Sequence, residues 1–279
     1  KMTDENAFEV GRNVAITPGK VVYQNRLFQL IQYAPTTETV YEVPLVIFPP
    51  WINKFYILDL TAEKSFIRWA VEQGITVFVA SWKNADESIA DATIDTYVEE
   101  GILQAVSVAR EICQTEGVHT IGYCVAGTTL SAAMAVLEAR GQASQIASAT
   151  FFTAQVDFAD AGELKFFVDD PSVETLDKMT EDKHVLDGRF MATTFNLLRS
   201  KDLIWNYVVN NYMLGKDYFP FDLLYWNSDA TNVPAKWHQQ YIKDMYRNNL
   251  LVKPGALTVC GVPIDLKTVK TPTFIQAGK

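Results

Sequence analysis

Residues 119–130 read HTIGYCVAGTTL, and the order of residue types in this stretch predicts a strand, a tight turn and a helix. A nucleophile carried on such a strained strand-to-helix turn forms a nucleophile elbow, which needs small residues on both sides of the nucleophile. Cys124 occupies the nucleophile position, two residues after Gly122. Ala126 stands where the usual pattern has a second glycine, and Gly127 follows it. The segment therefore predicts that Cys124 is a catalytic nucleophile.

The backbone around Cys124 is expected to supply the rest of the chemistry. The positive end of the following helix is expected to lower the pKa of the thiol. The Val125 N–H is the expected first donor to an oxyanion, and we place a second donor at the Ile52 N–H, in the loop after the apolar run at residues 44–48. The alternative is that Cys124 is a buried structural thiol, as most cysteines are.

Apolar runs of strand length alternate with helix-like runs on both sides of this segment. The expected strands are residues 21–33, 44–48, 75–81, 118–122, 147–153 and 271–277, and the expected helices are residues 65–73, 94–113 and 128–139. Several strands are apolar on both faces, which is typical of a parallel sheet covered by helices. With the elbow, this pattern predicts an α/β protein of the α/β-hydrolase fold with a mostly parallel sheet.

The pattern changes between residues 157 and 270, which are rich in aromatic residues, Asn and Asp. We interpret residues 1–156 as the first part of the hydrolase core, residues 157–270 as an inserted cap or lid over the site, and residues 271–279 as the core strand that resumes. Residues 169–183 are the most polar part of this insertion and are expected to move, whereas residues 203–212 look helical. The C-terminal part of the hydrolase fold is expected to be missing from this chain.

Composition excludes several classes of protein. Hydrophobic residues make up 48% of the 279 residues, which excludes a disordered chain, and the net charge of −9 disfavours binding to nucleic acid. No apolar run reaches the length of about 18 residues that a transmembrane helix needs, and no signal peptide is evident. Cys113 and Cys260 lack the elbow context and are interpreted as ordinary thiols, and scattered histidines give no metal site. No cofactor is expected.

Four long blocks of the sequence resemble polyhydroxyalkanoate synthases. They are PPWINKFYILDLTAEKSFIRWAVEQGITVFVASWKN at residues 49–84, GYCVAGT at 122–128, DLIWNYVVNNY and PFDLLYWNSDATN within 202–232, and KPGALTVCGVPIDL at 253–266. In the second block the family shows a lipase-like box with Cys in place of Ser. These blocks most resemble those of the class I enzymes, which use short-chain substrates and need no second type of subunit.

The resemblance implies an acyltransferase that polymerises (R)-3-hydroxyacyl-CoA, in particular 3-hydroxybutyryl-CoA, and releases CoA. The polyester would be held as a thioester on Cys124, with a His as general base and an Asp that supports the His. CoA is then part of the substrate, and Arg199 and Lys201 are candidate contacts for its phosphates. The implied partners are the growing polyester, the granule surface and a second copy of the chain, in a cytoplasmic, granule-associated protein.

The triad is incomplete in this sequence. The fold places the acid and then the His after the nucleophile. His119 precedes Cys124 by five residues of strand, about 16 Å away, and His184 and His238 fall in the insertion. Asp157 follows the strand after the elbow and is a weaker candidate acid. We therefore expect the triad Asp and His beyond Lys279, and we expect this chain alone to be inactive.

Two other functions remain open at this point. The first is a Cys-dependent hydrolase or thioesterase of the same fold, in which water replaces the hydroxyacyl acceptor and free acid is the product. The second is a granule-associated binding protein without catalysis. Fold alone does not separate these functions.

Overall fold

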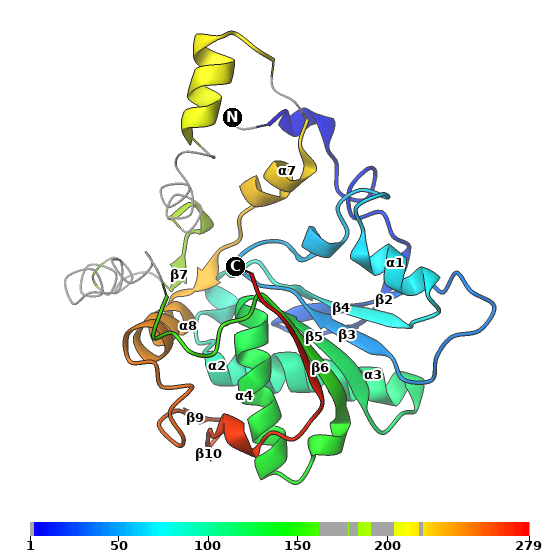
Figure 1. The fold of residues 1–279 in the computed structure, drawn as a ribbon, viewed down its shortest axis with the longest axis vertical. Coiled ribbons are helices and arrows are strands. Elements are labelled where there is room, and N and C mark those ends of the chain that lie inside the picture. Colours follow the sequence, from blue (N-terminus) through cyan, green and yellow to red (C-terminus); the bar gives the residue numbers. More distant parts are fainter. Residues whose placement is uncertain (1–2, 162–177, 179–183, 191–203, 218–219, 279) are drawn as a thin grey trace.

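A computed structural model describes residues 3–161, 178, 184–190, 204–217 and 220–278 of the chain (Figure 1). The core is one seven-stranded sheet in the order β1-β2-β4-β3-β5-β6-β11. The strands are β1 (Gly19–Gln24), β2 (Phe28–Tyr33), β3 (Leu45–Phe48), β4 (Val77–Trp82), β5 (Val118–Tyr123), β6 (Ile146–Phe152) and β11 (Thr273–Gln276). β2 pairs antiparallel with both β1 and β4, and every other pairing is parallel. This order, with the crossover of β3 and β4, confirms the predicted α/β-hydrolase fold.

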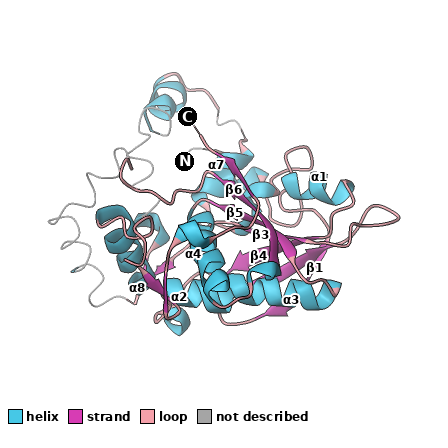
Figure 2. Cartoon of the chain, turned by 60° about the horizontal axis from the view of Figure 1, so that its bottom comes forward, coloured by secondary structure: helices cyan, strands magenta, loops and turns pink. Residues whose placement is uncertain are grey.

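The central strands are buried on both faces because helices cover both sides of the sheet. Alternate residues of β3 belong to different core clusters: Leu45 and Ile47 pack with α1 (Phe66–Glu72), whereas Val46 and Phe48 pack on the opposite face. That second face is covered by η4 (Tyr97–Leu103), α3 (Gln104–Cys113) and α4 (Val125–Ala139). Figure 2 shows α1 and α3 on opposite sides of the strands. The double burial explains the nearly continuous apolar runs in the sequence.

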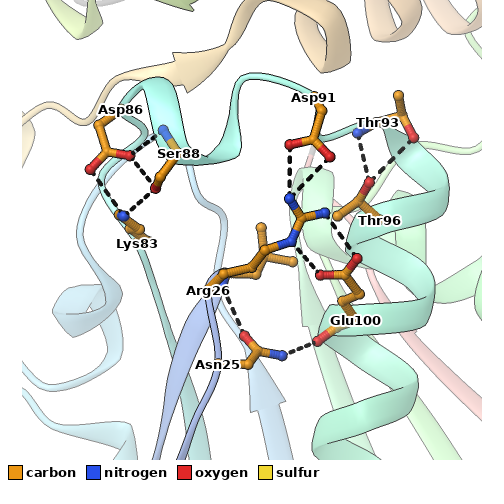
Figure 3. A network of polar contacts seen from close by, with 10 residues as sticks. Asn25, Arg26, Lys83, Asp86, Ser88, Asp91, Thr93, Thr96 and Glu100 are labelled. Atoms are coloured by element: carbon orange, nitrogen blue, oxygen red, sulfur yellow. Dashed lines mark hydrogen bonds and ion pairs between the residues drawn. The ribbon is translucent and has the colours of Figure 1, made fainter.

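The helix predicted over residues 94–113 is present but is not a uniform α-helix. It consists of α2 (Ile94–Thr96), a π-helical segment η4 and α3. Thr93 and Thr96 form a capping box where it begins. A polar network fastens its first turns to the sheet, because Arg26, in the turn between β1 and β2, makes ion pairs with Asp91 and Glu100 (Figure 3).

The remaining elements are short. The 3-10 helices are η1 (Glu5–Ala7), η2 (Phe55–Leu58), η3 (Glu87–Ile89), η5 (Ala143–Gln145) and η10 (Leu266–Thr268). Two small antiparallel pairs join β7 (Val185–Leu186) to β8 (Val233–Pro234) and β9 (Thr258–Val259) to β10 (Val262–Pro263). Further helices in the described part of the chain are α7 (Asp222–Ser228), α8 (Ala235–Gln240) and the π-helices η8 (Val208–Met213) and η9 (Tyr241–Arg247).

The described parts of residues 157–270 fall into two kinds. α8, η9 and the hairpin of β9 and β10 pack into the main core cluster, where Trp237, Met245 and Val259 are buried. η8 instead lies away from the sheet, beyond α7 (Figure 1). A helix at residues 204–213 agrees with the helical pattern of residues 203–212. Apart from residue 178, the polar segment 169–183 lies outside the described residues.

Candidate active site

Cys124 lies on a strained turn between β5 and α4. Its backbone has φ 54° and ψ −126°, a conformation that residues other than glycine rarely adopt. The turn is held from both sides: the Cys124 N–H donates to the Phe152 carbonyl at 3.0 Å, and the Cys124 carbonyl accepts from the Gly127 N–H at 2.9 Å. The Cys124 side chain is exposed. This is the geometry of a nucleophile elbow, as the sequence predicts.

Glycine is needed at two positions of this elbow because β5 and α4 nearly touch there. A Cβ on Gly122 would lie 2.6 Å from Gly127 Cα, and a Cβ on Gly127 would lie 2.4 Å from Ala154 Cβ. Ala126 is fully buried. The close approach of α4 to its neighbours is therefore at Gly127. This explains why alanine is accepted at position 126, where the usual pattern has glycine.

The pKa of the Cys124 thiol is shifted opposite to the sequence expectation. Desolvation by the surrounding protein raises this pKa, and the Val125 N–H, which hydrogen-bonds to the sulfur, offsets only part of the effect. The lowering expected at the helix N-terminus is present through the Val125 N–H, but loss of water around the sulfur outweighs it, so the pKa is raised. The thiol consequently needs a base to become a nucleophile near neutral pH.

The loop after β3 brings Ile52 to the same edge of the sheet as Cys124. Phe48, the last residue of β3, is in register with Gly122 of β5, so both chains leave the sheet side by side. The Trp51 carbonyl accepts from the Thr231 hydroxyl at 2.7 Å, and the Ile52 carbonyl accepts from the Thr231 N–H at 3.3 Å. These bonds fix the loop through its carbonyls, while the Ile52 N–H meets no acceptor in the described part of the chain. The role of Ile52 as second oxyanion donor stays a prediction.

An aromatic cluster that the sequence analysis missed joins this loop to α8 and η9. Trp51 stacks on Tyr97 with ring centroids 4.1 Å apart and meets Trp237 edge-on at 5.3 Å. Trp237 in turn stacks on Tyr241 at 5.1 Å. Burial is the main cause of the raised pKa values of Tyr241 and Tyr246, and a charge on Cys124 raises both further. These two phenols therefore lie near the nucleophile, and only the aromatic richness of the insertion hinted at them.

None of the three histidines, all of which the structure describes, has a hydrogen bond to Cys124. His119 is exposed at the start of β5, and its Nδ1 lies 2.7 Å from the Ser148 hydroxyl. His238 is buried, which lowers its pKa to about 4, and the His184 carbonyl accepts from the Ala235 N–H. The expectation that no histidine before Lys279 serves Cys124 stays a prediction.

Asp157 has a structural environment. Its carboxylate accepts from the Ala159 N–H at 2.9 Å and from the Asn249 amide at 2.7 Å, and these bonds lower its pKa. It ties the chain after β6 to the end of η9. The described residues contain no cluster of His, Cys, Asp or Glu able to hold a metal ion. Arg199 and Lys201 lie outside the described residues.

The sheet order and the elbow define the class of protein: an α/β-hydrolase fold with cysteine as the candidate nucleophile. Solved structures similar to the chain include brefeldin A esterase, a bacterial homologue of human hormone-sensitive lipase (TM-score 0.38, 16% identity, 56% of this chain and 44% of that chain). A chain from a structure described as "LipS and LipT, two metagenome-derived lipolytic enzymes" is also similar (TM-score 0.41, 11% identity, 85% of this chain and 72% of that chain).

Sequence comparison adds the family. Residues 1–70 match the family described as "Poly-beta-hydroxybutyrate polymerase (PhaC) N-terminus". The "Poly(3-hydroxyalkanoate) polymerase subunit PhaC" of Cupriavidus necator is 49% identical over 99% of this chain and 48% of its own length. The "Poly(3-hydroxyalkanoate) polymerase" of Methylorubrum extorquens is 50% identical over 98% of this chain and 45% of its own length. The chain belongs to the poly(3-hydroxyalkanoate) polymerase family and spans about half the length of these curated relatives.

Proposed function

We propose that the protein containing this chain is an acyltransferase that polymerises (R)-3-hydroxyacyl-CoA, with Cys124 as its nucleophile. The observation that carries the proposal is the tight strand-to-helix turn between β5 and α4, which holds an exposed Cys124 at φ 54° and ψ −126°. A buried structural thiol needs no such backbone conformation, and strain of this kind clusters at active sites. The names of the relatives support the product class, a poly(3-hydroxyalkanoate).

The proposed chemistry has two half-reactions. In the first, the Cys124 thiolate attacks the thioester carbonyl of hydroxyacyl-CoA, the bond from that carbonyl carbon to the CoA sulfur breaks, and CoA leaves as a thiol after protonation. In the second, a 3-hydroxyl oxygen attacks the acyl group on Cys124, the bond to the Cys124 sulfur breaks, and an ester bond forms. The hydroxyl proton passes to a base and then returns to the thiol.

The residues of this chain would act on the carbonyl oxygen in both steps. The N–H groups of Val125 and Ile52 would stabilise the negative charge that develops there. Transfer from one thiol to another is nearly isoenergetic, which suits a cysteine better than a serine at this position. The raised pKa of Cys124 means that a base is required, and the proposed His and its Asp would come from beyond Lys279.

The partners and the location follow from the same proposal. We propose a granule-associated cytoplasmic protein that dimerises and binds its polyester product, with 3-hydroxybutyryl-CoA as substrate and with Arg199 and Lys201 as contacts for the CoA phosphates. Exposed apolar side chains on and beside η8 support an apolar partner: Trp205, Tyr212, Met213 and Leu214 are 60–87% exposed. None of the described helices is long and apolar enough to cross a bilayer.

The test is covalent labelling of the full-length protein with 3-hydroxybutyryl-CoA, followed by intact-protein mass spectrometry. We expect acyl adducts on Cys124 and polymer as the product. Cys124→Ala should abolish both, and Cys124→Ser should keep the fold but lose at least about a hundredfold in rate, because a hydroxyl ionises far less readily. Full polymerisation by Cys124→Ala would contradict the proposal.

The alternatives give different products in the same experiment. A hydrolase or thioesterase would release free hydroxy acid from the Cys124 adduct without polymer. A binding protein without catalysis would form no adduct.

A further inference from the structure

The segment that follows α7, residues 229–232, runs along the loop that leaves β3. Asn53 of that loop and Ala230 form an antiparallel bridge. The segment also reaches the loop after β4, where the Asn232 N–H donates to Asn84 Oδ1 at 2.7 Å. β3 and β4 are neighbouring parallel strands, so both loops leave the same edge of the sheet. A piece of the insertion is therefore fastened to the edge of the sheet that carries the elbow.

Thr231 makes the central contacts of this segment with the β3 loop. Its hydroxyl donates to the Trp51 carbonyl at 2.7 Å, and its N–H donates to the Ile52 carbonyl at 3.3 Å. Thr231 is only 3% exposed, and the bond from its hydroxyl to Trp51 is buried. A hydrogen bond shielded from water in this way holds its two groups in a fixed orientation.

The bond from the Thr231 hydroxyl controls the peptide group that contains the Ile52 N–H. The Trp51 carbonyl and the Ile52 N–H belong to one planar peptide unit, and the described residues contain no cis peptide bond. In a planar trans peptide the C=O and the N–H point in opposite directions. Fixing the Trp51 carbonyl on Thr231 therefore directs the Ile52 N–H away from Thr231. A hydrogen bond to the carbonyl also polarises the unit and strengthens its N–H as a donor.

We propose that Thr231 is a positioning residue that directs the Ile52 N–H at the oxyanion formed during acyl transfer to Cys124. The inference rests on the proposed acyl transfer with Ile52 as the second oxyanion donor. The strand order favours this direction, because β3 lies between β4 and β5. The segment of Thr231 reaches the loop after β4, whereas Cys124 follows β5. The insertion thereby contributes to the oxyanion site without touching the substrate.

The experiment measures single-turnover acylation of Cys124 by 3-hydroxybutyryl-CoA in the full-length protein, followed by intact-protein mass spectrometry. Thr231→Val removes the hydroxyl but keeps the shape and the backbone N–H. Its maximal acylation rate should fall at least about tenfold, but less than the roughly hundred- to thousandfold that loss of a whole oxyanion donor costs. The half-saturating concentration should change little, because oxyanion contacts form in the transition state. Thr231→Ser keeps the hydroxyl and should restore the rate.

Alkylation of Cys124 by iodoacetamide separates positioning from a general loss of structure. This reaction displaces iodide at a saturated carbon and forms no oxyanion, so its rate should be equal in all variants. Thr120→Val is the matched control: Thr120 is 1% exposed, and its hydroxyl donates to the Ser148 carbonyl at 3.1 Å within the sheet. It removes one comparable bond and should leave acylation unchanged. Thr231→Ala, which also lacks the hydroxyl, should show the same selective loss as Thr231→Val and does not depend on how a valine packs.

Three results would overturn the role of Thr231. They are an unchanged acylation rate in Thr231→Val and Thr231→Ala, an equal loss of acylation and alkylation, and a loss of the same size in Thr120→Val. The absence of any adduct in the unmodified protein would instead overturn the proposed acyl transfer.

Discussion

At the scale of single residues, Cys124 combines a strained backbone with a thiol that resists ionisation. A non-glycine residue held at φ 54° destabilises the fold by about 1–3 kcal/mol. This conformation persists because the structure on both sides of the residue holds it. Here β5 and α4 hold it, through the bonds to Phe152 and Gly127. Desolvation keeps the thiol protonated above the ordinary thiol pKa. The elbow thus fixes where the sulfur is, while its reactivity depends on a base.

The raised pKa of Cys124 predicts how its alkylation depends on pH. In this chain the midpoint for reaction with iodoacetamide should lie above that of a cysteine in an unfolded peptide, because the protein around the sulfur displaces water and favours the neutral thiol. The same shift stabilises the fold at pH values below the ordinary thiol pKa, and this stabilisation is lost as the pH rises through the folded pKa. Peptide mapping after alkylation at a series of pH values measures the midpoint at Cys124, and Cys124→Ser is the control. A midpoint below that of the unfolded peptide would contradict the shift.

At the scale of elements, the start of α4 packs tightly against β5 and against Ala154, which follows β6. Gly127→Ala should destabilise the fold by about 1–3 kcal/mol, because its Cβ would lie 2.4 Å from Ala154 Cβ and 2.7 Å from the Gly122 carbonyl oxygen. Gly278→Ala is the control, since nothing lies within 4 Å of its added Cβ. Urea unfolding of the two variants makes the comparison. Equal stability of Gly127→Ala and the unmodified chain would show that α4 is free to move away from β5.

The elements that the sequence predicts well are those with short apolar runs and clear boundaries. β3 is a four-residue buried run that ends at two prolines, and the elbow has its own pattern around Gly122. The packing of α8 and η9 into the core was not predicted, because residues 157–270 were interpreted as a cap. Trp237, Tyr241 and Met245 are nevertheless four residues apart, which is a helical spacing. The i→i+5 bonding of η9 leaves no signature in sequence periodicity, so the tyrosine pair beside Cys124 was missed.

At the scale of the whole molecule, two groups of exposed apolar side chains among the described residues bear on association with partners. One is η8 and its flanks, with Trp205 and Tyr212, for which we propose an apolar partner. The other is β11, which pairs with β6 and has no second neighbour among the described strands. On β11, Phe274 is 63% exposed and Ile275 is 65% exposed. An exposed apolar edge strand offers unpaired backbone groups to other chains, so the second place is a predicted site of aggregation.

A charge on β11 should therefore keep this chain soluble. Ile275→Lys should reduce light scattering at high protein concentration, because a lysine on an edge strand opposes pairing with another copy. Ile112→Lys is the matched control: Ile112 is 41% exposed on α3, so it adds the same charge at an exposed isoleucine away from the sheet edge. If net charge alone governed aggregation, the two variants would scatter equally, and the edge of β11 would not be the contact. A decrease confined to Ile275→Lys would identify strand pairing at β11 as the route by which copies of this chain associate.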